Sequence, residues 1–146
     1  MPHTLAAQLG QSIFLIVIAA SAWTGGRTER VAAATLLVQM IVSSLLNNTD
    51  GVSLEGGALA GDLGALIVFA VLAFRTDRRW TLWATAFQVL AVLTHCARML
   101  DPSLHQWAYM STAIFWGYGV LCALIVGASQ AALRRRRRAG AGSEAT

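Results

Sequence analysis

The chain has 146 residues, of which 56% are hydrophobic and only 12% are charged, with a net charge of +4. So few charged residues cannot cover the surface of a water-soluble protein of this length, which excludes an ordinary soluble domain. All eleven basic residues are arginine, so the chain has no lysine for a Schiff base with retinal or pyridoxal phosphate.

The first two apolar segments predict membrane-spanning helices over residues 5–23 and 31–48. Ala20-Ser21-Ala22 resembles a signal-peptide cleavage site, but the preceding polar region has no basic residue, which argues against a secretory signal. The alternative to a first span is an N-terminal interfacial or signal-like helix. In the second segment, polar residues recur every four positions and form one stripe that should face protein: Thr35, Gln39, Ser43 and Asn47.

The start of the third predicted span decides where Asp62 lies. The apolar run from Leu63 to Phe74 has 12 residues, about 18 Å of helix at 1.5 Å each, which is too short to cross a bilayer core of about 30 Å. The helix is therefore predicted over residues 57–74. This places the Asp62 carboxylate inside the membrane or at its edge.

The fourth and fifth spans are predicted over residues 80–100 and 107–132. Arginines close both ends of the fourth segment, and Trp80 and Trp83 mark one end as a membrane boundary. Pro102 lies in the turn between the two spans, because proline cannot continue a helix. In this span Thr81, Thr85, Gln88 and His95 share one face.

Together these segments predict an all-α fold, a bundle of five transmembrane helices, with four spans plus the N-terminal helix as the alternative. Residues 1–133 form a single transmembrane helical domain, and residues 134–146 are predicted to be a basic, disordered cytoplasmic tail. Two helices carry small residues four positions apart, which allows close backbone approach: Gly57, Gly61 and Ala65 in one, and Gly119, Ala123 and Gly127 in the other.

The arginines predict the orientation, because short loops rich in arginine remain cytoplasmic. Ten of the eleven arginines fall in the first loop, the third loop and the C-terminal tail, giving that side a net charge of +7 and the other side −3. The N-terminus is therefore predicted outside and the C-terminus in the cytoplasm. The high alanine and glycine content suggests a GC-rich bacterial gene and so a bacterial cytoplasmic membrane.

A basic run follows the last span directly and is predicted to contact anionic lipid, an attraction of about 1 kcal/mol per residue near the surface. It consists of Arg134, Arg135, Arg136, Arg137 and Arg138. A nucleic-acid partner is not predicted, because no aromatic residues alternate with these arginines.

With this topology the polar residues gather at the outer ends of the second, third and fourth spans. The candidate outer polar cluster consists of Asp62, His95, Arg98, Asn47 and Asn48. An ionisable group inside a span should have a partner. We therefore expect the Asp62 carboxylate to lie within hydrogen-bonding reach of His95, Arg98 or Asn47. The alternative is a purely structural ion pair.

No cofactor or metal is predicted. Haem at His95 is the alternative: it needs a second axial ligand, and because no other span contains a histidine, His105, Met99 or Met110 would have to supply it. A metal site formed with His3, His105 and Asp62 has no helical ligand spacing. Cys96 and Cys122 form no CxxC pair and are interpreted as small buried hydrophobic residues.

The sequence contains no phosphate loop, HExxH motif or recognisable hydrolase motif. The first functional expectation is a non-enzymatic accessory or assembly subunit that packs against a larger membrane complex or against copies of itself. The second is a small oligomeric transporter or channel for protons or a small anion that uses the outer polar cluster. An enzyme acting on lipid or quinone is a third, weaker alternative.

Overall fold

The computed structural model describes residues 2–47 and 54–143, with side chains described for residues 8–46 and 56–140. The described chain is helical apart from short connections, which confirms the predicted all-α fold. The five helices are α1 (Pro2–Thr24), α2 (Arg27–Asn47), α3 (Leu54–Arg75), α4 (Arg79–Leu100) and α5 (Gln106–Ser143).

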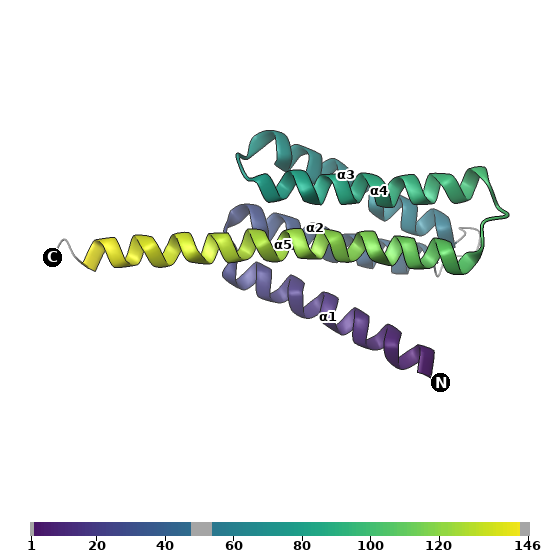
Figure 1. Ribbon diagram of the computed structural model, residues 1–146, viewed down its shortest axis with the longest axis horizontal. Helices are drawn as coiled ribbons and strands as arrows, with labels where there is room; N and C mark the ends of the chain where they lie inside the picture. Colours follow the sequence, from purple (N-terminus) through teal and green to yellow (C-terminus); the bar gives the residue numbers. More distant parts are fainter. Residues whose placement is uncertain (1, 48–53, 144–146) are drawn as a thin grey trace.

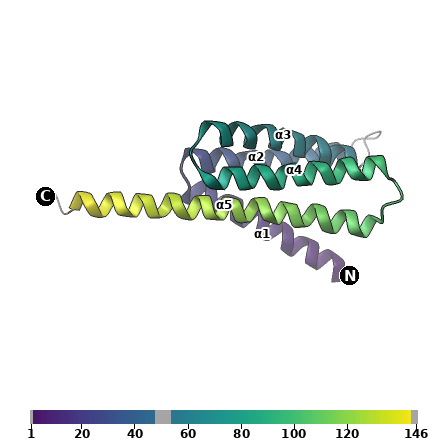
Figure 2. The same ribbon diagram turned by 45° about the horizontal axis from the view of Figure 1, so that its top comes forward.

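Helices α2 to α5 form a bundle in which consecutive helices run antiparallel, as short connections dictate (Figure 1). The most extensive packing joins α4 to α5, α2 to α3 and α3 to α4. Helix α1 packs less extensively on α2 and α5, and its N-terminal end diverges from the bundle in both views (Figure 2).

Four helices are long and apolar enough to cross a membrane: Arg27–Leu46, Gly56–Arg75, Arg79–Leu100 and Gln106–Gly140. In α1 the apolar stretch Gln8–Thr24 is shorter, so a fifth span through α1 stays a prediction. Large apolar side chains such as Ile67 and Phe115 point away from the bundle and are 65% exposed, as expected of surfaces that face lipid acyl chains.

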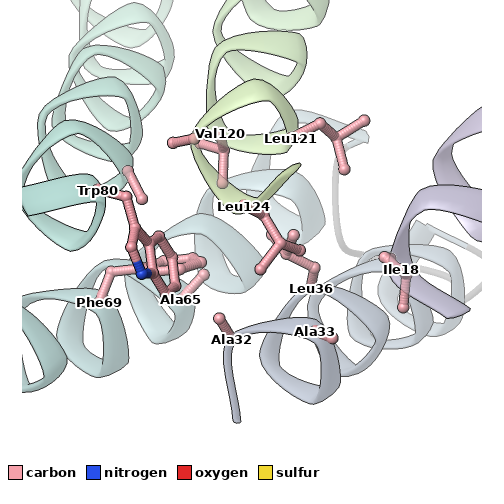
Figure 3. Close-up of a cluster of buried hydrophobic side chains, with 12 residues drawn as sticks. Ile18, Ala32, Ala33, Leu36, Ala65, Phe69, Trp80, Val120, Leu121 and Leu124 are labelled. Carbon is pink, nitrogen blue, oxygen red and sulfur yellow. The ribbon is translucent and has the colours of Figure 1, made fainter. Parts of the chain in front are cut away.

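The hydrophobic core lies where α2, α3, α4 and α5 meet, and Ile18 brings α1 against it (Figure 3). Trp80 is only 2% exposed, so its indole packs inside the bundle and does not face lipid. Gly127 leaves room for the indole, because a Cβ atom there would lie 2.6 Å from Trp80 Cε2. Trp83 is 65% exposed, and the membrane boundary at this end of α4 stays a prediction.

The predicted close approach at small residues is confirmed within the chain. Gly119 and Gly127 of α5 receive the rings of Phe87 and Trp80 from α4, while Gly61 of α3 lies against Ser43 of α2. These contacts explain the four-residue spacing of glycine as helix packing inside one bundle.

The structure differs from the sequence prediction at the end of α5. The helix was expected to stop at residue 132 before a disordered tail, but it continues through the arginine run to Ser143. The extension has a simple cause, because arginine and alanine are strong helix formers and no proline interrupts them. It projects beyond the rest of the bundle (Figure 1).

Candidate functional site

The registers of α3 and α4 direct polar side chains into the bundle. Asp62 precedes Ala65 and Phe69 by three and seven residues, so all three lie on the same buried stripe of α3. On α4, Gln88 and His95 share the buried face with Thr81, each seven residues from the next. Helix periodicity thus places a carboxylate opposite an amide and an imidazole.

The Asp62 carboxylate is the centre of a buried cluster, and the residue is only 8% exposed. Its Oδ2 lies 2.6 Å from Nε2 of His95, which confirms the contact predicted between these two residues. Its Oδ1 accepts a 2.7 Å hydrogen bond from Nε2 of Gln88 and a further hydrogen bond from Nε2 of Gln39. Asp62 therefore joins α3 to both α2 and α4.

The hydrogen-bonded chain extends to α5 through the imidazole. The Tyr109 hydroxyl lies 2.7 Å from Nδ1 of His95, and the two rings meet edge to face with centroids 5.5 Å apart. One placement of protons satisfies both contacts: Nε2–H donates to the Asp62 carboxylate, while Nδ1 accepts from the Tyr109 hydroxyl. We call Asp62, His95, Tyr109, Gln88 and Gln39 the Asp62 cluster.

Arg98 adjoins this cluster at its α5 side. Its Cζ lies 6.0 Å from the centroid of the Tyr109 ring, within the range of a cation–π contact. The guanidinium also donates to the carbonyl oxygens of Pro102 and Leu104 and to Oε1 of Gln106. Arg98 therefore organises the turn between α4 and α5 and places positive charge beside the Asp62 cluster.

The outer polar cluster was also predicted to contain Asn47 and Asn48. Asn47 ends α2, but its side chain and the whole of Asn48 lie outside the described residues. The side chain of His3 also lies outside them, and His105 is exposed before α5.

Sequence reasoning placed Gln39 and Gln88 on polar stripes but assigned them only to general packing. It missed Tyr109, although the sequence contains a usable signal. Tyr109, Val120 and Leu124 fall on one inward-facing stripe of α5, separated by 11 and then four residues, which is the spacing of one helix face.

A second buried polar site lies at the opposite end of the bundle. Glu29 is fully buried, forms an ion pair with Arg78 and accepts a 2.8 Å hydrogen bond from the Gly26 N–H. Arg135 of α5 donates to the Gly25 carbonyl nearby. These contacts join the start of α2 to the α3–α4 connection and to α5. From the sequence these residues were expected only to contribute charge to the loops and the tail.

An open groove of about 830 Å³ lies between the diverging α1 and helices α2 and α5. Its walls include Phe14, Met40 and Ile114, together with the polar residues Gln11, Gln39 and Tyr118. Gln39 belongs both to this groove and to the Asp62 cluster, so the two features are adjacent.

Comparison with known proteins identifies no relative: no protein-family model matches the chain, and neither a curated protein nor a solved structure is similar to it.

Proposed function

We propose that this chain is a small integral protein of a bacterial cytoplasmic membrane that acts as a non-enzymatic accessory or assembly subunit of a larger membrane complex. The observation that carries this proposal is the buried hydrogen bonding of the Asp62 carboxylate, which is linked to side chains of α2, α4 and, through His95, α5.

Burial of the cluster favours a scaffolding role. Asp62, Gln88, His95 and Tyr109 are all buried, and each bonds to another member of the group. A group that carries ions must exchange with water, whereas buried side chains that bond to one another hold helices in one arrangement. The result is a preassembled unit of α2 to α5 that presents lipid-facing surfaces and a loosely packed α1 to a partner.

The proposed orientation places the N-terminus outside and the C-terminus in the cytoplasm. Its support is that Arg30, Arg78 and Arg135 lie at the same end of the bundle, where all three contact residues in or beside the α1–α2 connection. Because α5 stays helical, the run Arg134–Arg138 rises about 6 Å along its axis. That rise matches a headgroup layer of about 5–8 Å, so the arginines form a collar suited to anionic lipid.

The accessory role is tested by tagging the chain at its natural expression level and resolving mild-detergent extracts on native gels. We expect migration with a larger membrane protein in fixed stoichiometry, and loss of the assembled partner when the chain is deleted. Migration alone, together with undiminished assembly of all membrane complexes in the deletion strain, would contradict the proposal.

A second candidate, a transporter or channel for protons or a small anion, is favoured by one specific observation. Tyr109, His95 and Asp62 form an unbroken series of groups that can each donate or accept a proton.

Proteoliposomes with an internal pH dye test this function: Asp62→Asn should abolish flux, while Asp77→Asn, which alters an exposed carboxylate, should retain it. Equal rates for wild type and empty liposomes would exclude proton transport.

A further inference from the structure

The groove between α1, α2 and α5 has the size and composition of a small-molecule site. Its volume of about 830 Å³ falls within the range of roughly 300–1,000 Å³ found for such sites, which are mostly apolar with a few polar groups. Phe14, Leu36 and Ile114 supply apolar walls, while Gln39 is one of the few polar residues.

The Gln39 amide contributes an unused hydrogen-bond acceptor. Its Nε2 donates to the Asp62 carboxylate, and this contact fixes which end of the amide faces α3. Among the residues that the structure describes, its buried Oε1 has no hydrogen-bond partner. Buried polar atoms are almost always paired, so this oxygen calls for a donor from outside the bundle.

We propose that the groove binds a small lipid-soluble molecule whose single hydroxyl or N–H group donates to Oε1 of Gln39. Such a molecule would enter from the bilayer, cover the apolar walls and complete the hydrogen bonding of the amide. The site goes beyond the accessory role. Its ligand would be separated from Asp62 only by the Gln39 side chain, which would contact both.

Glycine positions provide a blocking variant and a matched control. Gly117 lies on the groove, and a Cβ atom added there meets no other atom within 4 Å. Leucine at this position should therefore extend into the groove without disturbing the core. Gly140 offers the same free space, but it lies in the C-terminal extension of α5 and does not line the groove.

The test measures binding of 4-nonylphenol and its methyl ether, 4-nonylanisole, to the full chain in phosphatidylcholine nanodiscs. The phenol has one hydrogen-bond donor, its hydroxyl group, and the methyl ether has none. We expect the phenol to bind roughly 3- to 10-fold more tightly than the ether, the ratio that one neutral hydrogen bond provides. Gly117→Leu should weaken phenol binding at least about tenfold, and Gly140→Leu should leave it unchanged.

Equal affinity for phenol and ether in the wild-type chain would overturn the proposal, and this comparison requires no variant to fold. Unchanged phenol binding by Gly117→Leu would also overturn it. If Gly117→Leu removed a protein partner from native extracts while neither probe bound the wild type, the groove would be a helix-docking surface and the small-molecule proposal would fail.

Discussion

Asp62 uses both carboxylate oxygens, one for His95 and the other for the amides of Gln39 and Gln88. A carboxylate can accept about four hydrogen bonds, so one short side chain can serve several helices. In a bilayer no water replaces these partners, and each donor left behind by a substitution stays unpaired unless the helices rearrange.

Replacement of Asp62 by alanine should therefore destabilise the bundle by about 2–4 kcal/mol, because it leaves three donors without their acceptor. Asp62→Asn should cost less, since its amide oxygen still accepts from a glutamine. Reversible unfolding in mixed detergent micelles measures both changes. Asp77→Asn serves as the surface control, with an expected change near zero, and an equally small effect of Asp62→Ala would show that the cluster does not stabilise the bundle.

The turn after α4 contains a carboxylate whose ionisation should respond to its neighbour. The Ser103 hydroxyl, followed by its backbone N–H, donates to Asp101 and lowers the pKa of that carboxyl below its ordinary 3.8, and the Arg98 charge acts in the same direction. Since a lowered folded-state pKa stabilises the turn above the ordinary value, this contribution is lost as pH falls through the folded-state pKa.

Carboxyl-carbon NMR should accordingly give an Asp101 midpoint below 3.8 in the wild type. Ser103→Ala removes the hydroxyl donor, so the midpoint should rise toward the ordinary value while the N–H contact preserves part of the shift. An unmoved midpoint would mean that the hydroxyl contact does not persist in solution.

Counting residues along each span was enough to place Asp62 and His95 at a similar depth and to predict their contact. It could not identify the remaining partners, because glutamine on a polar stripe is equally common in ordinary helix packing. Tyr109 was harder still, since tyrosine near a span end normally indicates a membrane interface. Whether the Tyr109 hydroxyl is buried or interfacial depends on how α5 is rotated about its own axis relative to α4.

At the scale of helices, the α4–α5 contact depends on glycines that accept aromatic rings. Phe87 packs on Gly119. Trp80, which is on the same helix as Phe87, packs on Gly127 further along α5. The sequence spacing predicted close approach, but it could not specify which helix would approach. The small residues of α5 could have served a second copy of the chain equally well.

Gly127→Ala should destabilise the bundle by about 1–3 kcal/mol, because the added Cβ would lie 2.6 Å from the buried indole of Trp80. Gly117→Ala adds the same methyl group to the same helix where no atom lies within 4 Å, so it should be neutral or stabilising by up to about 1 kcal/mol. Thermal unfolding of the two variants makes the comparison. Equal melting temperatures would argue that α4 and α5 can separate slightly at no cost.

At the scale of the whole molecule, charge divides the bundle into two ends. The end with the Glu29–Arg78 ion pair also carries the arginines of the first connection and of α5, and the C-terminal extension leaves from it (Figure 1). The apolar lengths of the spans and this division were readable from the sequence. The burial of Glu29 was not, since a charged residue in a short connection normally faces water.

Reporter fusions test the proposed orientation. Alkaline phosphatase should be active when fused after Glu55 or Ser103 and inactive after Arg79 or Arg138, because arginine-rich connections remain in the cytoplasm. Activity after Arg138 would reverse the C-terminal assignment.

The order of the Asp62 cluster along the chain bears on how the protein is made. During synthesis Gln39 enters the membrane before Asp62, which it later contacts, and Asp62 enters before Gln88 and His95. Tyr109 comes last and meets a His95 already in place. Each member of the cluster after Gln39 thus finds at least one partner synthesised ahead of it, so the Asp62 carboxylate need not leave the insertion machinery without a partner.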